Sequence, residues 1–176
     1  MDLNSEKLNE LRREMRDVIA ISSLPSIWTH YNVNQIAESL AETLALSLSL
    51  DFVYICFMNG NKEVQASSVE PASLRRLTTE NLQTFLEPWM QRSSLKSGTQ
   101  SMQSPSGEGL LQVNFAPIGY NFKNGVLVTA SSSAQFPTDA DRLIINISSN
   151  QTNVAVENKW AQHEATRLLK VDEEAT

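Results

Sequence analysis

The sequence predicts an α+β fold, in which a central antiparallel β-sheet carries the N- and C-terminal helices on one face. Three observations support this class. An uncharged apolar run at 52–58 leads directly into Asn59-Gly60, a dipeptide typical of tight β-hairpins. Two further apolar segments, at 110–117 and 124–131, are separated by a short turn. Segments with helical periodicity stand before and after the strands, so helices would cover the sheet.

The N-terminal segment 3–22 is expected to form a helix. Leu24-Pro25 is expected to end it, because proline disfavours helical geometry in the preceding residue. Its apolar residues recur with heptad spacing: Leu8, Leu11, Met15 and Val18. One interpretation is a helix that packs this face on its own domain. The other is a helix that pairs with its copy, in which case these four residues form the interface of a homodimer.

The strand at 52–58 is rich in β-branched and aromatic residues, which suits a central strand covered on both faces. The hairpin that begins at Asn59-Gly60 would return at 63–69. The serine- and glycine-rich segment 93–109 is expected to be a loop without regular structure. Such long loops tend to be mobile or functional.

Three further helices are expected, at 33–49, 79–90 and 139–169. A residue that can cap the first turn precedes or begins each of them: Asn32 or Asn34, Thr78 or Thr79, and Thr138. The inward face of the last helix would carry Leu143, Ile144, Ile147, Gln151, Val154 and Ala155. Its more polar far end, from 156 to 170, is expected to extend past the domain.

A ligand pocket is predicted between the first strand and the helix at 79–90. Side chains alternate across a strand, so Tyr54 and Cys56 share one face, and their polar groups suit a partly hydrated cavity. The predicted pocket consists of Tyr54, Cys56, Phe85 and Trp89, with a filled core as the alternative. The nearest partners for an anionic ligand would be Arg75, Arg76 and Arg92.

Composition favours one globular domain, since 41% of the 176 residues are apolar. With 14 basic and 20 acidic side chains, the formal charge is −6, which disfavours nucleic acid as a partner. The N-terminus is charged and lacks the apolar core of a signal peptide. The longest nearly uncharged run, 43–58, is too short for membrane insertion. These features predict a cytoplasmic protein.

The chain has a single cysteine, Cys56, which cannot form an internal disulfide. It could attach a chromophore or act as a redox nucleophile, but a small buried residue in a central strand is the usual role of a free cysteine. No motif for a nucleotide phosphate, a catalytic serine or a zinc protease is complete. The sequence therefore predicts no catalytic residue and no metal site, and no cofactor is evident.

Three segments of the chain resemble the GAF domain, a PAS-related sensor module of signalling proteins. They are LSLDFVYICF, FAPIGYNFKNGVLVTASS and FPTDADRLIINISSNQTNVAVEN. A fourth, LPSIWTHYNVNQIAESLAETL, is similar to GAF modules at the front of bacterial sensor histidine kinases. The resemblance spans about 24–160. It divides the chain into a linker or dimerisation helix at 1–23, a GAF-like sensory domain at 24–160, and a helical extension with a tail at 161–176.

In GAF-containing proteins, the sheet carries helices on one face and a pocket for a small effector on the other. The flanking helices join neighbouring modules and often pair in parallel dimers. The resemblance therefore implies a regulatory sensory module of a bacterial signal-transduction protein, such as a sensor histidine kinase of a two-component system. It would bind an unidentified small molecule or relay signals through its flanking helices.

Two alternatives remain. The chain could be a ligand-free dimerisation or interaction module, or a reductase built on the GAF fold. A reductase of that kind needs a second thiol to recycle, which the chain lacks. The chain itself is thus expected not to be an enzyme. Any kinase activity would belong to a downstream signalling domain of the parent protein.

Overall fold

The computed structural model describes residues 2–60, 62–69, 74, 77–91 and 94–175. Within them, five strands form one sheet in the order β2-β1-β5-β4-β3, and every neighbouring pair is antiparallel. The strands are β1 (Phe52–Asn59), β2 (Lys62–Val69), β3 (Gly98–Gln103), β4 (Leu110–Ile118) and β5 (Gly125–Ser131). The α+β class with an antiparallel sheet is therefore confirmed.

Strand β3 corrects the sequence analysis, which treats 93–109 as an irregular loop. It pairs with β4 from Gly98 opposite Phe115 to Gln103 opposite Leu110. It lies at the edge of the sheet, where Met102 is its buried residue and the other side chains are exposed. An edge strand of this kind needs little apolar patterning, because the backbone ladder supplies most of its contacts.

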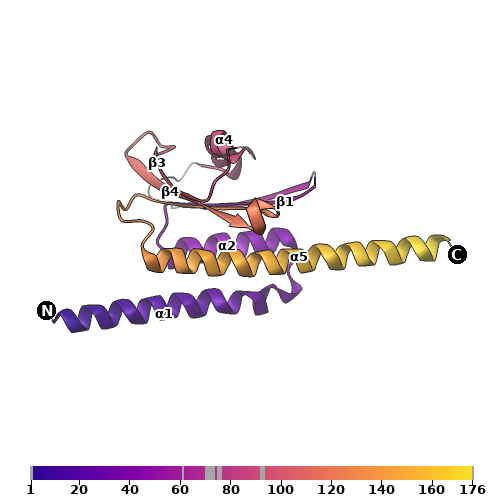
Figure 1. Ribbon diagram of the computed structural model, residues 1–176, viewed down its shortest axis with the longest axis horizontal. Coiled ribbons are helices and arrows are strands. Elements are labelled where there is room, and N and C mark those ends of the chain that lie inside the picture. Colours follow the sequence, from indigo (N-terminus) through magenta and orange to yellow (C-terminus); the bar gives the residue numbers. More distant parts are fainter. Residues whose placement is uncertain (1, 61, 70–73, 75–76, 92–93, 176) are drawn as a thin grey trace.

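The helices form layers on both faces of the sheet, as Figure 1 shows. They are α1 (Leu3–Ile27), α2 (Val33–Ser47), α4 (Thr79–Met90) and α5 (Asp139–Ala175), with short 3-10 turns η1 (Trp28–His30) and η2 (Tyr120–Phe122). Helix α4 covers one face, while α2 and α5 cover the other. Helix α1 packs beneath α2 and α5, on the side away from the sheet. Both terminal helices thus belong to one face, as predicted.

Three helix starts are fixed by the capping residues that the sequence indicates. Asn32 and Gln35 exchange side-chain and backbone hydrogen bonds of 2.9 Å at the start of α2. Thr78 and Asn81 exchange bonds of 3.1 Å in the same way at α4. At α5, the Asp141 backbone N–H donates to Thr138 Oγ1 at 3.2 Å. In return, the Thr138 backbone N–H donates to the Asp141 carboxylate at 2.9 Å. Each pair satisfies donors that a helix start leaves free.

Helix α1 continues through Pro25, contrary to the prediction that it ends there. Proline removes one backbone donor and crowds the preceding turn. The surrounding residues outweigh this cost, because Leu24 is 4% exposed and Trp28 only 1%. The helix is closed by the Trp28 backbone N–H, which donates to the Leu24 carbonyl. Burial of these side chains therefore carries the helix one turn past the expected end.

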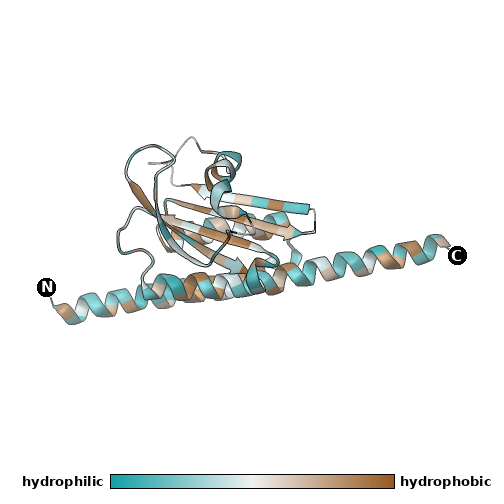
Figure 2. Ribbon diagram, turned by 45° about the horizontal axis from the view of Figure 1, so that its top comes forward, coloured by the Kyte–Doolittle hydropathy of each residue, from teal (hydrophilic) through white to brown (hydrophobic). Residues whose placement is uncertain are grey.

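The sheet separates two apolar clusters. The larger one lies between the sheet and the helices α1, α2 and α5, and includes Ile21, Trp28, Leu40, Ile55 and Ile144. The other lies under α4 and includes Phe52, Leu82, Leu86, Val113 and Val128. Strand colours in Figure 2 show the apolar residues concentrated on the sheet. No helix in the described part of the chain combines the length and apolarity needed to cross a bilayer.

The buried face of α5 differs from the predicted one. Leu143 and Val154 were expected to point inward, yet they are 54% and 58% exposed. The residues that face the core are Ile144, Ile145, Ser148, Ser149, Thr152 and Val156. Three of these are small hydroxyl residues, which the apolar pattern could not reveal as core positions. The helix also runs to Ala175 rather than 169, and all residues from 161 to 175 are exposed.

Candidate functional site

The predicted pocket residues lie together on the α4 face of the sheet. Tyr54 and Cys56 belong to the cluster under α4, and Phe85 and Trp89 pack against it. Ile55 belongs to the cluster on the opposite face. The alternation expected for this strand is therefore confirmed. Contact between these residues and a ligand stays a prediction.

Side chains fill this face where the four residues meet. Tyr54 is 1% and Cys56 3% exposed. The Phe85 ring meets Phe52 edge-on, with centroids 6.4 Å apart and planes at 88°, and lies 6.3 Å from the Trp89 ring. Such edge contacts contribute packing energy beyond the area buried. The arrangement corresponds to the filled core that the sequence analysis left open as the alternative.

One cavity on this side lies at the β4–β5 turn. It has a volume of about 120 Å³ and is lined by Leu95, Asn121, Phe122 and Lys123. Pockets for drug-sized ligands are larger, at roughly 300–1,000 Å³. This cavity therefore suits a few waters or a side-chain movement better than a large effector. Arg75, Arg76 and Arg92, the expected partners of an anionic ligand, lie outside the described residues.

The environment of Cys56 makes its thiol unreactive. Burial, followed by the nearby Glu63 carboxylate, raises the pKa of Cys56 to about 11, although a hydrogen bond with Tyr54 acts in the opposite direction. Burial also raises the pKa of Tyr54 well above its ordinary value. Because the thiolate is the nucleophilic form, a thiol with this pKa is a poor nucleophile at neutral pH. The geometry agrees with the role of a small core residue.

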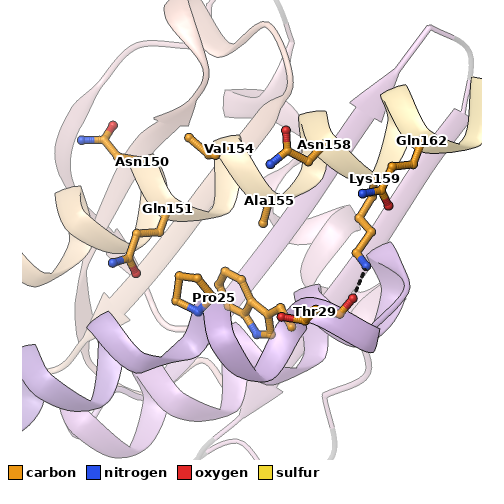
Figure 3. A pocket seen from close by; sticks show the side chains of 10 residues that line it. Pro25, Thr29, Asn150, Gln151, Val154, Ala155, Asn158, Lys159 and Gln162 are labelled. Carbon is orange, nitrogen blue, oxygen red and sulfur yellow. Dashed lines mark hydrogen bonds between the residues drawn. The ribbon is translucent and has the colours of Figure 1, made fainter. Parts of the chain in front are cut away.

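The helix side of the molecule carries a larger concavity that the sequence analysis did not find. It lies between the end of α1 and the middle of α5 and has a volume of about 500 Å³. Figure 3 shows Gln151 and Lys159 extending from α5 towards Pro25 and Thr29. Lys159 Nζ donates to the Thr29 carbonyl at 2.8 Å, which joins the two elements. Trp28 contributes to the lining.

A buried acceptor in this groove lacks a donor. Within the described residues, Gln151 Oε1 is covered and has no hydrogen-bond partner. A buried polar atom without a partner destabilises the fold by about 1–3 kcal/mol. A group with an N–H or O–H in the groove could satisfy this atom only after the Gln151 side chain turns outward.

A second concavity, of about 300 Å³, lies along the middle of α1. Its lining comes from Leu11, Met15, Val18 and Ile19 of α1 and from the start of α5. Leu8, Leu11 and Met15 are 50%, 57% and 60% exposed. Val18 differs from its three predicted partners, because it is half-buried and packs on the domain's own core. Leu8, Leu11 and Met15, three of the four residues in the predicted dimer stripe, are therefore exposed and available to a partner.

Helix α5 carries an apolar repeat of its own, at intervals of seven residues. Its members are Ile147, Val154, Ala161 and Leu168. Val154 is 58% and Leu168 53% exposed. A period of seven is typical of helices that pair with other helices. The sequence contains this repeat, but the sequence analysis does not identify it, because it assigns Val154 to the core.

No family model matches the sequence, and no curated protein does so either. Solved structures do match. A phycoerythrobilin-bound GAF domain of a cyanobacterial phytochrome has a TM-score of 0.56 at 12% identity, with 85% of this chain and 98% of that chain covered. The GAF domain of a Pseudomonas syringae pv. tomato protein, provisionally assigned as a sensor histidine kinase, has a TM-score of 0.53 at 15% identity. That match covers 99% of this chain and 100% of the other.

This chain has the GAF fold. A third structure agrees, the GAF domain of an Acinetobacter phosphoenolpyruvate-protein phosphotransferase, with a TM-score of 0.53, 16% identity, and coverage of 86% and 95% of the two chains. Identities of 12 to 16% establish the GAF fold and leave the ligand and the partner to be argued from this chain. The resemblance seen in the sequence is therefore confirmed at the level of the fold.

Proposed function

We propose that this GAF-fold chain is a regulatory sensory module of a signalling protein, and that it works as a homodimer which relays a signal between α1 and α5. The placement of these two helices carries the proposal. They lie side by side, run in the same direction and reach opposite ends of the molecule (Figure 1). A shift of one helix against the other would therefore be felt at both ends of the module.

The exposed apolar side chains support a second copy as the partner. Leu11 and Met15 on α1 line the same concavity as Leu143 on α5, and Leu8 is exposed one turn before them. The seven-residue repeat of α5 extends this surface beyond the sheet. Apolar side chains in such a continuous arrangement are stabilised when another helix covers them.

An effector that binds the GAF module would act on the α4 face, near Tyr54, Cys56, Phe85 and Trp89. It would have to open this cluster, because the side chains now fill it. The filled face favours a second candidate function, a ligand-free dimerisation module that connects its neighbours. The two candidates differ in whether a small molecule changes the relation of α1 to α5.

Under this proposal, catalysis lies outside the chain. A cytoplasmic histidine kinase is one parent that fits, since one of the matching structures comes from a protein with that provisional assignment. Its kinase domain would receive the signal from α5. The reductase alternative loses support from the structure, because the thiol of Cys56 is buried and its pKa is raised to about 11.

Native mass spectrometry of the purified chain tests the dimer and the effector together. At about 10 µM we expect the mass of two chains, since an interface that functions in a cell forms at such concentrations. Additional mass that unfolding releases would identify an effector. A dimer without added mass would support the ligand-free module. A monomer with nothing bound would contradict both candidates.

A charge placed in the apolar stripe sharpens this test. Met15→Glu should raise the dissociation constant of the dimer by about 30-fold, because it puts a carboxylate into an apolar interface. Asn9→Glu is the matched control, since Asn9 is exposed on α1 but stands outside the stripe. Equal dissociation constants for the two variants would place the interface elsewhere.

A further inference from the structure

We propose that the β4–β5 turn, Gly119–Asn124, is a regulatory connector that couples the α4-side cluster to helix α5. The inference rests on the proposed sensory function and names the segment through which a signal crosses the sheet. One end of the turn is inserted into the cluster where an effector would act. The other end is bonded to the helix that would carry the output.

Phe122 is the contact with the α4 side. Its side chain is 8% exposed and belongs to the same apolar cluster as Tyr54 and Cys56. The cavity of about 120 Å³ lies directly against it. Phe122 therefore has packing partners on one side and free space on the other, so its position can respond when the cluster rearranges.

Asn124 is the contact with α5. Its side-chain Nδ2 donates to Asn153 Oδ1 at 2.7 Å and to Glu157 Oε1 at 2.8 Å. The same residue is 6% exposed, so water competes little for these bonds. Ser149, one turn earlier on α5, donates to the Pro117 carbonyl just before the turn. Three residues spaced by four along α5 thus hold one corner of the sheet.

The backbone keeps Asn124 in place between the strands. Its N–H donates to the Ile118 carbonyl and its carbonyl accepts from Met58 N–H, both at 2.9 Å. Gly119 has a φ of 79°, and a Cβ there would lie 3.0 Å from Asn153 Oδ1. A side chain at this position would press on the amide that joins the turn to α5. The closeness of turn and helix therefore depends on glycine.

The backbone of the turn is also strained. Asn121 and Phe122 have φ values of 51° and 58°, a left-handed conformation that is unusual for a bulky residue such as phenylalanine. Such geometry persists when surrounding contacts hold it. The holding contacts are the burial of Phe122 on one side and the bonds of Asn124 on the other. Loss of either contact would let the turn relax and would release the other.

Hydrogen–deuterium exchange on the full chain tests this coupling without an effector. Phe122→Ala should accelerate exchange of the α5 amides at 149–160 by about 10-fold relative to those of β1, because α5 loses its anchor through the turn. In an Asn124→Ala background, which removes both side-chain bonds from the turn to α5, the same substitution should add less than about 2-fold. Phe122→Leu, a milder change, should give a smaller effect in the same direction.

Leu111→Ala is the matched control. Leu111 is 3% exposed in the same cluster, at the opposite end of β4 from the turn. Its truncation should accelerate exchange in the sheet without a selective effect on α5. An effect of Phe122→Ala that is uniform over the chain, or that persists undiminished in the Asn124→Ala background, would overturn the connector.

Because no effector or dimer is needed for this measurement, its failure would leave the proposed function standing. Conversely, a monomeric chain with an intact connector would count against the proposed function alone.

Discussion

The two faces of the sheet are covered in different ways. On one face, α1, α2 and α5 enclose a cluster in which Trp28, Ile36 and Leu40 are at most 1% exposed. On the other, Phe52, Leu82 and Leu86 are fully buried, but Phe85 and Trp89, the aromatic side chains of α4, are only half-buried. A face with more complete burial contributes more to stability. The helix side is thus suited to hold the fold together, and the α4 side to rearrange.

Of the two helices that cover this side of the sheet, α5 turns the more polar face to the core, since all buried residues of α2 are apolar. Its core-facing Ser148 and Thr152 donate to carbonyls of their own helix, one turn back. On the sheet, Thr129 Oγ1 is buried and finds no partner among the described residues. Small hydroxyl side chains bury less apolar area than leucine or isoleucine does. A helix seated in this way can shift with less loss of packing than α2 could.

The largest expected effect contrasts two tryptophans, one on each face. Trp28→Ala should lower the free energy of unfolding by about 3–5 kcal/mol, because it leaves a large cavity in a tightly packed cluster. It also leaves Ser39 Oγ without the Trp28 Nε1–H that donates to it at 3.0 Å. Trp89→Ala should lower it by only about 1–2 kcal/mol, since that side chain is half-buried. Urea unfolding at neutral pH measures both.

Comparable losses for the two tryptophans would remove the distinction between a stabilising face and an adaptable one. Trp89→Phe is a useful addition, because it keeps an aromatic ring next to Phe85. It should recover most of the loss seen in Trp89→Ala.

A neighbouring pair on α5 gives the next largest effect. Ile144→Ala should lower the free energy of unfolding by about 2–4 kcal/mol, because Ile144 is 2% exposed in the helix-side cluster. Leu143→Ala should change it by less than about 0.5 kcal/mol in the monomer, since surface substitutions rarely do more. The measurement is urea unfolding of both variants in the Met15→Glu background, where dimerisation is weakened.

This pair tests the orientation of α5 directly. If Leu143→Ala were as destabilising as Ile144→Ala, Leu143 would face the core together with Ile144, as the apolar pattern predicts, and the exposed position of Leu143 would be wrong.

The sequence predicts the fold well where patterns are local. The Asn59-Gly60 hairpin, the caps of α2, α4 and α5, and the alternation of β1 each depend on a few adjacent residues. The predictions for two elements were wrong, because tertiary contacts determine their structure. Helix α1 passes through Pro25 since Leu24 and Trp28 are buried, and β3 forms since β4 offers it a partner. Neither the burial around Pro25 nor the pairing of β3 with β4 can be recognised from the local sequence.

The candidate sites were predicted less completely. The alternation of side chains along β1 placed Tyr54 and Cys56 on the same face. The sequence could not show whether other side chains would fill that face. The groove between α1 and α5 was missed because serines and a threonine, rather than leucines, face the core from α5. Val154 was therefore assigned inward, although it belongs to an exposed repeat with Ala161 and Leu168. A search for apolar repeats left over after the core is assigned could have found it.

A smaller effect appears at alkaline pH and reports on the α4 face. The pKa of Cys56 rises from an ordinary 9.0 to about 11 in the folded chain, so the folded state holds the proton more tightly than the unfolded state. The associated stability is fully present below pH 9 and is lost as the pH rises towards 11. Between pH 8 and pH 10.5, the free energy of unfolding should fall by about 2 kcal/mol more in the wild type than in Cys56→Ala.

Tyr54 contributes to the same decline, because burial raises its pKa too. The share of this shift that burial causes is present in both proteins and cancels, whereas the smaller share that Cys56 causes is lost in Cys56→Ala. Urea unfolding of the two proteins at both pH values is the measurement. An identical pH dependence would mean that the α4 cluster is more hydrated than its packing indicates.

The smallest effect is expected at the exposed end of α5, which contrasts with both faces of the sheet. Arg167 and Glu164 form an ion pair with a shortest distance of 2.7 Å, and both side chains are largely in water. Solvent and salt screen such pairs, so Arg167→Ala should leave the urea midpoint of the monomer unchanged.

The same substitution in the dimer is more informative, since Leu168 follows directly and belongs to the seven-residue repeat. If the repeat pairs two copies of α5, Leu168→Ala should weaken the dimer in sedimentation velocity while Arg167→Ala does not. Equal weakening by both would indicate that this end of α5 associates through its charges rather than through its apolar repeat.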